Sequence, residues 1–317
     1  TAYLSHLQED LDTEFKLSEA ALRTEGSTMG LKIGDSASLR ALCYGMLLPS
    51  GNDAANAAAF RIGGSKEGFC RLMNEKAAEL NMTGTNFTSP SGLDEGNNLS
   101  TAHDMAILTS AALENQDFAQ MVRTKTKTVE VGSPPRQLYL KNHNRLLWED
   151  EIIGVKTGFT KKAGRCLVTA AEIKGQRFIT VTLNCGDDFN MHRAIYRELA
   201  KNLVETDFSF VLKEVKIPLT GGTKEFIKAQ PTGYKRAYIL KGSEGKLEVS
   251  YSVEPFLYAP VEKGKAVGRV EITQNGKRIL LLPLNAMDGS DSRLSEYRSI
   301  KEIIRDFFDF PWGNELP

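Results

Sequence analysis

Residues 47–55 read LLPSGNDAA, and the patterns on either side of this stretch decide how it folds. Apolar side chains recur with helical spacing over residues 39–47, and Pro49 stops that helix. The alanine-rich residues 53–60 then favour a second helix. We therefore expect residues 50–52, Ser-Gly-Asn, to form a tight connection between two helices, from which side chains project into a cleft.

A second short motif, Lys-Thr-Gly at residues 156–158, comes about a hundred residues later. Residues 166–171 and 178–183 are apolar strand patterns joined through residues 174–175, which predicts an antiparallel hairpin. The motif leads into the first of these strands. Its position, ahead of a hairpin and after the helical region, suggests a second wall of the same cleft.

The residue types in the two motifs suit acyl transfer by a serine enzyme. Ser50 offers a hydroxyl that passes a proton, and Asn52 offers an amide that grips a catalytic lysine and a substrate carbonyl. Lys156 adds positive charge, which favours an anionic substrate. Thr157 donates to a terminal carboxylate, and Gly158 lets a substrate backbone lie close to the strand. We therefore predict that Ser50, Asn52 and Lys156 are catalytic and that Thr157 and Gly158 bind substrate.

Each motif taken alone also has an ordinary structural interpretation. Serine, glycine and asparagine are common in turns. Thr-Gly occurs again at residues 83–84 and 220–221, where no function is implied. The order and placement of the two motifs together favour the functional interpretation.

The sequences around the motifs extend the pattern. The chain resembles the D-alanyl-D-alanine carboxypeptidases, the low-molecular-mass penicillin-binding proteins, over roughly residues 1–205. Four stretches carry the resemblance: EGSTMGL at 25–31, LLPSGNDAA at 47–55, SGLD at 91–94 and GVKTGFT at 154–160. Residues 259–264 and 283–284 resemble the β-rich domain that comes after the catalytic domain in this family.

This resemblance implies an α/β (α+β) fold of the penicillin-binding and β-lactamase-like type, with an antiparallel sheet and a helical subdomain. We assign residues 1–205 to the catalytic domain, residues 206–292 to a small all-β domain, and residues 293–317 to a C-terminal amphipathic helix. The aromatic face of that helix suits either a membrane interface or packing on the β domain. Its acidic residues weaken the membrane alternative.

The resemblance also implies a function. The enzyme would remove the terminal D-alanine of a peptidoglycan stem peptide ending in D-Ala-D-Ala through an acyl-enzyme, and penicillin and other β-lactams would acylate it. No metal and no organic cofactor are implied. The protein would act outside the cytoplasm as a secreted protein, attached to the outer face of the bacterial cytoplasmic membrane.

One family signature, the Ser-x-x-Lys that supplies nucleophile and base, is not found ahead of Ser50. Only Ser243 has a lysine three places on, and a charged turn explains that tetrapeptide. Residues 1–4 resemble the segment directly after Ser-x-x-Lys in the family, so we expect Thr1 to lie just beyond this signature. On this basis residues 1–317 form no covalent penicillin adduct. A catalytically inactive peptidoglycan-binding relative is the alternative.

Composition restricts the remaining choices. The chain has 40 basic and 40 acidic side chains among 317 residues, so nothing marks it as a nucleic-acid-binding protein. Four cysteines, without metal-binding spacing, are expected to be buried free thiols: Cys43, Cys70, Cys166 and Cys185. A β-lactamase is a further alternative, but the Glu-x-x-Leu-Asn element of the class A enzymes is absent. His143 is either a basic residue near the substrate carboxylate or a surface or packing histidine.

Overall fold

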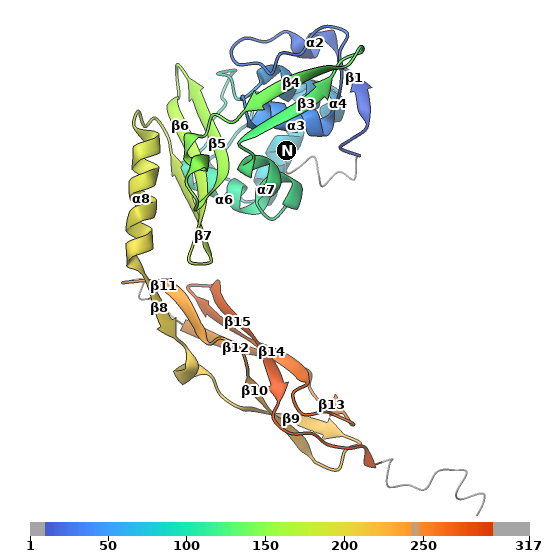
Figure 1. Cartoon of the computed structure of the whole chain (residues 1–317), viewed down its shortest axis with the longest axis vertical. Coiled ribbons are helices and arrows are strands. Elements are labelled where there is room, and N and C mark those ends of the chain that lie inside the picture. Colours follow the sequence, from blue (N-terminus) through green and yellow to red (C-terminus); the bar gives the residue numbers. More distant parts are fainter. Residues whose placement is uncertain (1–9, 243–244, 246, 294–317) are drawn as a thin grey trace, which may run out of the picture. The chain divides into compact units, whose positions relative to one another are not determined.

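A computed structural model describes residues 10–242, 245 and 247–293, and no helix in these ranges is long and apolar enough to cross a membrane. The chain divides into two compact units, Thr1–Lys201 and Asn202–Pro317. The predicted order of a helical region, an antiparallel sheet and a β-rich C-terminal module is confirmed (Figure 1). The division lies a few residues before the domain boundary that we assigned from sequence.

Helices dominate the first part of unit 1. They are α2 (Glu19–Leu22), α3 (Leu39–Leu47), α4 (Asn52–Gly63), α5 (Lys66–Glu79), α6 (Ala102–Ala112) and α7 (Gln116–Arg123). Side-chain caps explain where several of them begin: the hydroxyl of Ser38 accepts from Ala41 N, and that of Ser65 accepts from Gly68 N. The predicted helices on either side of Ser50 are confirmed as α3 and α4. The sequence also predicts helices from Ser65 to Leu80 and from Ser100 to Leu113, and these are confirmed as α5 and α6, whereas α7 was not predicted.

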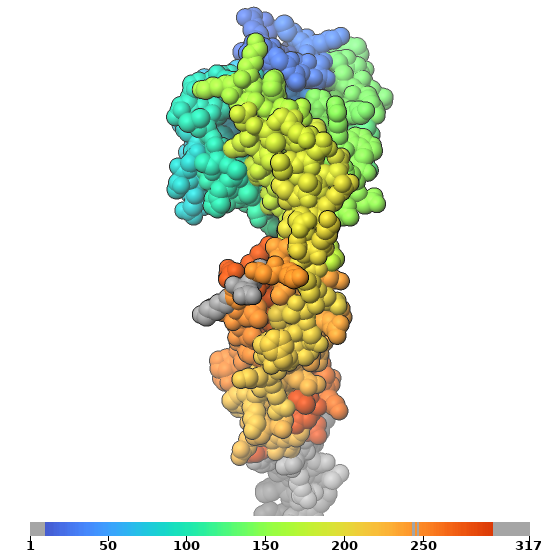
Figure 2. Space-filling view, turned by 90° about the vertical axis from the view of Figure 1, so that its left-hand side faces the viewer, coloured from blue at the N-terminus to red at the C-terminus, as the bar shows by residue number. Residues whose placement is uncertain are grey.

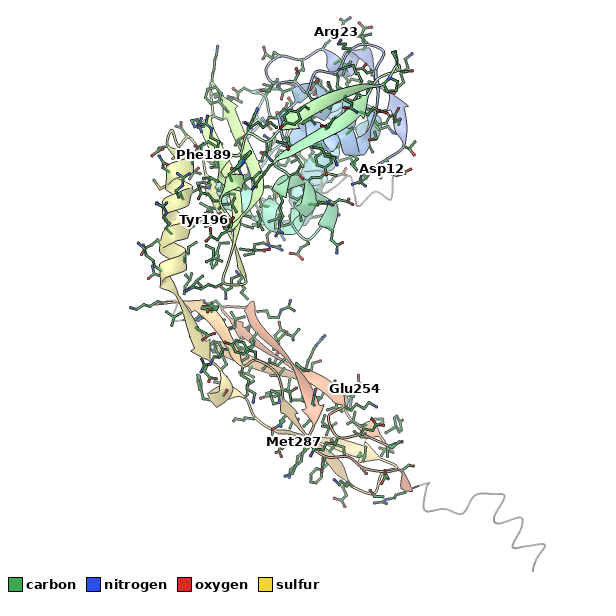
Figure 3. All side chains as sticks on the ribbon, viewed as in Figure 1. Asp12, Arg23, Phe189, Tyr196, Glu254 and Met287 are labelled. Carbon is green, nitrogen blue, oxygen red and sulfur yellow. The ribbon has the colours of Figure 1, made fainter. Side chains whose placement is uncertain are left out.

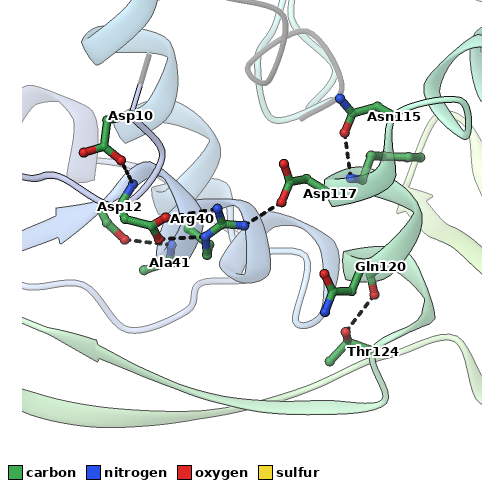
Figure 4. Close-up of polar contacts among 10 residues, drawn as sticks. Asp10, Asp12, Arg40, Ala41, Asn115, Asp117, Gln120 and Thr124 are labelled. Carbon is green, nitrogen blue, oxygen red and sulfur yellow. Dashed lines mark hydrogen bonds and ion pairs between the residues drawn. The ribbon is translucent and has the colours of Figure 1, made fainter. Parts of the chain in front are cut away.

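Arg40, at the start of α3, joins two distant parts of the helical region. Its guanidinium donates to Asp12 Oδ1 at 2.7 Å and to Asp117 Oδ1, on α7, at 2.8 Å (Figure 4). All three side chains are partly or largely exposed, so this network adds little stability by charge alone. Its geometry connects α3 and α7 with the chain that precedes β1 (Glu14–Lys16).

Two small antiparallel pairs lie beside the helices. Strand β1 pairs with β2 (Ser36–Ser38), and β3 (Thr126–Val131) pairs with β4 (Arg136–Lys141). In the sequence, residues 128–131 and 137–140 predict short strands around a Gly-Ser-Pro-Pro turn, and the second pair confirms them. The first pair was not predicted, because strands of three residues carry too little alternation to be recognised.

The main sheet of unit 1 has three antiparallel strands in the order β5 (Ile152–Thr160), β6 (Gly164–Ile173) and β7 (Gln176–Thr182). Helix α8 (Asp188–Asn202) lies on one side of the sheet, and α6 and α7 contact the other (Figure 1). In Figure 2 the side of α8 that faces away from the sheet is toward the viewer, and no other described segment covers it there. The Lys-Thr-Gly motif leads into the β6–β7 hairpin as predicted, and it lies within a strand of its own, β5, whose pairing with β6 was not predicted.

A buried polar network attaches α8 to the sheet. His192 Nδ1 is 2.7 Å from Thr169 Oγ1 on β6, and His192 Nε2 is 2.9 Å from Thr182 Oγ1 on β7. Tyr196, one turn later on the same helix, places its hydroxyl 2.7 Å from Thr169 Oγ1 (Figure 3). Because every polar atom named here has a partner, the network fixes the helix on the sheet without an unsatisfied group.

Unit 2 is built of strands. Its six-stranded sheet has the order β12 (Leu247–Val253), β14 (Ala266–Gln274), β15 (Lys277–Ala286), β10 (Phe226–Pro231), β9 (Val215–Thr220) and β13 (Leu257–Tyr258). Strands β8 (Leu203–Asp207) and β11 (Arg236–Leu240) pair separately. The Asn275-Gly276 sequence predicts a tight hairpin turn between residues 270–272 and 278–280. The β14–β15 pair confirms it, and both turn residues have a positive φ. The Ser243 tetrapeptide and residues 294–317 lie largely or wholly outside the described residues.

None of the four cysteines forms a disulfide. Cys43 and Cys70 are buried as predicted, whereas Cys166 and Cys185 are half-buried. Cys166 is on β6 opposite Gly158, at the edge of the region that carries the motifs. The expectation of burial was wrong for these two because both lie near the open end of the β6–β7 pair.

Candidate active site

Ser50 occupies a constrained turn between α3 and α4. Its φ is 62°, in the left-handed region that residues with a side chain rarely adopt. The next residue must be glycine: a Cβ on Gly51 would lie 2.8 Å from Asp53 Oδ1 and 2.9 Å from Met29 N. A glycine at position 50 would adopt this φ without strain, whereas a serine there costs about 1 kcal/mol of folding free energy. The presence of a serine despite this strain points to a role for its hydroxyl.

Asp53 holds the neighbouring loop against this turn. Its buried carboxylate accepts from the backbone N–H groups of Met29 at 2.9 Å, of Gly30 at 3.1 Å and of Leu31 at 3.1 Å. Asn52 N also donates to Ser27 O at 2.8 Å. Residues 25–31, one of the four recognisable stretches, are thereby fixed beside Ser50.

The two motifs meet through Lys156. Its Nζ donates to Ser50 Oγ at 2.6 Å and to Thr157 O at 2.7 Å. Desolvation lowers the pKa of Lys156 from 10.5 to about 8. The amine is therefore still protonated at neutral pH, but it gives up its proton more readily than an exposed lysine does. The structure therefore brings together residues that are more than a hundred positions apart in sequence.

Asn52 lies in the same region but makes a different contact from the one expected. Its Nδ2 donates to Glu25 O at 2.8 Å, and the side chain is buried at the first position of α4. Its carbonyl oxygen can still accept a hydrogen bond, and its second amide N–H can still donate one. The amide is thus positioned by the 25–31 loop, and its predicted grip on a lysine stays a prediction.

A cavity of about 890 Å³ opens beside these residues. Ser50, Thr157 and Gly158 line it, together with Ser27 and Pro49. Strand β5 is at the edge of its sheet. On the side of Thr157 and Gly158 that faces away from β6, the backbone N–H and C=O groups therefore pair with no other strand of the described residues. An extended peptide could add to such an edge.

Several cavity residues were not found from sequence. They come from the end of β4, the 3₁₀ helix η1 (Arg145–Trp148), β6 and the start of α8: Lys141, Asn142, Arg145, Trp148, Phe159, Arg165, Asp188 and Phe189. His143 also lines the cavity, and burial together with the charge of Lys156 lowers its pKa. The basic residues in the KNHNR stretch at 141–145 were the available signal, but only His143 was considered.

The cavity is electropositive. Lys141, Arg145 and Arg165 line it, and Asp188 is the carboxylate among its described lining residues. Asp188 Oδ1 accepts from Arg165 at 2.7 Å, and both arginines lie near the Phe189 ring, at 5.4 Å for Arg165 and 5.9 Å for Arg145. Figure 3 labels Phe189 on α8. The remaining positive charge favours an anionic ligand.

Comparison with known proteins agrees with this geometry. Residues 4–187 match the family model described as D-alanyl-D-alanine carboxypeptidase. The chain belongs to this family. Residues 201–289 match the model described as the penicillin-binding protein 5 C-terminal domain, which accounts for the β-rich unit. The resemblance inferred from the motifs and the penicillin-binding fold are both confirmed.

Individual relatives give the same assignment. D-alanyl-D-alanine carboxypeptidase DacC of Escherichia coli is 33% identical over 279 residues, which cover 83% of this chain and 66% of DacC. DacF of Bacillus subtilis is 26% identical, with 88% of this chain and 73% of DacF covered. The chain thus spans about two thirds of the length of these carboxypeptidases.

Solved structures are similar as well. The D-alanyl-D-alanine carboxypeptidase DacD from Francisella tularensis has a TM-score of 0.61 and 26% identity, covering 92% of this chain and 84% of that one. The Streptomyces K15 DD-transpeptidase has a TM-score of 0.54 and 32% identity, covering 57% of this chain and 75% of that one.

Proposed function

We propose that this carboxypeptidase-family protein is a serine-type D-Ala-D-Ala carboxypeptidase, which removes the terminal D-alanine from peptidoglycan stem peptides through an acyl-enzyme. The observation that carries the proposal is the 2.6 Å contact between Lys156 Nζ and Ser50 Oγ beside an electropositive cavity. This contact joins the Ser-Gly-Asn and Lys-Thr-Gly motifs, neither of which alone would indicate a function. β-Lactams, as mimics of the substrate, acylate the same site.

Ser50 is the proton carrier in this proposal. An ammonium group only donates hydrogen bonds, so Ser50 Oγ accepts from Lys156 and keeps its own proton for another acceptor. That proton is available to the nitrogen of the departing D-alanine. The lowered pKa of Lys156 assists, because an ammonium near its pKa readily replaces the proton that the hydroxyl gives away.

The other motif residues hold the peptide. Thr157 donates to the terminal carboxylate, with the charge of Lys156 nearby. A Cβ built on Gly158 would meet Cys166 only at ordinary contact distances of 3.6 Å and more, so internal packing does not demand glycine there. The need to leave room for the substrate backbone along the edge of β5 explains a glycine at position 158 better. Asn52, held by its bond to Glu25 O, would use its remaining amide groups to bind the catalytic lysine and the substrate carbonyl.

Two alternatives are less well supported. The matched relatives carry the name D-alanyl-D-alanine carboxypeptidase, which favours neither an inactive peptidoglycan-binding protein nor a β-lactamase. We further propose action outside the cytoplasm, where peptidoglycan lies. Attachment to the membrane through residues 293–317 stays a prediction, since residues 294–317 lie outside the described part of the chain.

The complete protein should release free D-alanine from acetyl-L-Gln-D-Ala-D-Ala, measured by a coupled D-amino-acid oxidase assay. The same peptide ending in L-alanine is the matched control, and it should release none of its terminal residue. Failure of the complete protein to release D-alanine from the first peptide would overturn the enzyme proposal.

A further inference from the structure

Two lysines share one tryptophan ring at the edge of the cavity. Lys125 precedes β3 and Lys141 ends β4, and their ammonium groups lie 5.8 Å and 6.0 Å from the centre of the Trp148 ring. Lys141 pairs with Thr126, and Asn142 N donates to Lys125 O at 2.9 Å, so both lysines leave the same end of the hairpin, from its opposite faces. The ring of Trp148 is about half exposed, so a ligand can reach it.

Neither ammonium forms an ion pair with a carboxylate in residues 10–242, 245 and 247–293. Nearby cations differ: Arg165 pairs with Asp188, and Arg193 pairs with Glu149. Two like charges over one ring repel each other, and the attraction of an exposed ring for a cation offsets this only by about 0.5–1 kcal/mol each. An anion at the exposed edge of the ring, near both ammonium groups, would offset the repulsion.

One lysine of the pair and the tryptophan belong to the same cavity as the motif residues, and Lys125 is next to it through its contact with the Trp148 ring. Lys141 and Trp148 line it together with Ser50 and Thr157. In the proposed function Lys156 and Thr157 take the terminal carboxylate of the substrate. The charges of Lys125 and Lys141 are not used by that contact, and the apolar face of Trp148 between them suits the aliphatic part of a side chain that ends in a carboxylate.

We propose that Lys125, Lys141 and Trp148 form a subsite for a second, free carboxylate of the substrate. The inference rests on the proposed function and deepens it. The preferred substrates are stem peptides in which the residue before D-Ala-D-Ala carries a free carboxylate, and peptides in which that carboxylate is amidated are poorer. The preference depends on charge, so it weakens as the salt concentration rises.

Two peptides that differ in one group test this: acetyl-L-Glu-D-Ala-D-Ala and acetyl-L-Gln-D-Ala-D-Ala. With the complete protein we expect kcat/KM to be about fivefold higher for the glutamate peptide, which is what two partly exposed ion pairs supply. The difference should lie in KM and should shrink between 50 mM and 500 mM salt, about a threefold change in Debye length.

The variants separate this subsite from general charge effects. In Lys141→Gln the ratio between the two peptides should fall toward one, and Lys141→Arg should restore it. Lys16→Gln is the matched control: it removes an exposed lysine on β1, outside the cavity lining, and should leave the ratio near five. Equal kcat/KM for both peptides in the unmodified protein would overturn the subsite, and so would an unchanged ratio in Lys141→Gln. In either case, turnover of the glutamine peptide would still support the proposed function. Turnover of neither peptide would overturn both.

Discussion

Replacing Lys156 with methionine should lower the rate of acylation by benzylpenicillin by about 100- to 1,000-fold in the complete protein, a range typical for loss of a group that assists proton transfer and holds charge. The same change should leave the free energy of unfolding at pH 7 within about 1 kcal/mol of its normal value. Lowering the pKa of Lys156 to about 8 means that its burial as a charged group costs about 3 kcal/mol. Loss of the hydrogen bonds to Ser50 and Thr157, at about 1.5 kcal/mol each for a charged donor, offsets that gain.

The contrast between a large loss of acylation rate and a small change in stability makes this substitution informative. Acylation is measured by mass spectrometry over time, and stability by urea denaturation. Lys162→Met is the matched control, because Lys162 is an exposed lysine in the turn after β5. It should change neither quantity by much. A Lys156→Met protein that is less stable and acylates at the normal rate would show that the lysine is a structural residue.

The free energy of unfolding should also fall by up to about 3 kcal/mol as the pH is lowered from 6.5 to 4, because of His192. Burial lowers the pKa of this imidazole from 6.5 to about 4, against a smaller opposing effect of Asp188. The unfolded protein therefore binds a proton that the folded protein resists. The stabilisation is complete above pH 6.5 and is lost as the pH falls toward the folded pKa.

Urea unfolding curves at several pH values measure this slope. His192→Gln keeps a neutral polar side chain that can hydrogen bond to Thr169 and Thr182. Between pH 6.5 and 4 the variant should therefore lose about 3 kcal/mol less of its free energy of unfolding than the unmodified protein loses. His103→Gln is the control, since His103 is exposed and should leave the slope unchanged. Identical slopes in the unmodified protein and His192→Gln would contradict the assignment.

Local patterns were sufficient to predict the helices around Ser50. Apolar spacing, a serine cap and a proline stop all act within a few residues, so α3 and α4 were predicted from the 39–60 stretch alone. The β14–β15 hairpin was found for the same reason, because Asn275-Gly276 adopts the backbone that its turn requires.

Other features depend on contacts between distant residues. The polar half of β5, with Lys156 and Thr157, lacks the apolar run that marks a buried strand, so its pairing with β6 was not predicted. The cavity draws basic side chains from β4, η1 and β6, and no spacing in the sequence shows that they converge. The contact between Lys156 and Ser50 likewise exists only once the sheet is placed against the helices.

The central claim is that Thr157, beside Lys156, receives the terminal carboxylate of a D-Ala-D-Ala peptide. The most direct test compares kcat/KM of the complete protein for acetyl-L-Gln-D-Ala-D-Ala and for the same peptide with a C-terminal carboxamide. We expect the free acid to be preferred by about 100-fold, the value of hydrogen bonds to a charged group, and the preference to fall by about tenfold in Thr157→Val. Equal kcat/KM for the acid and the carboxamide would contradict the claim.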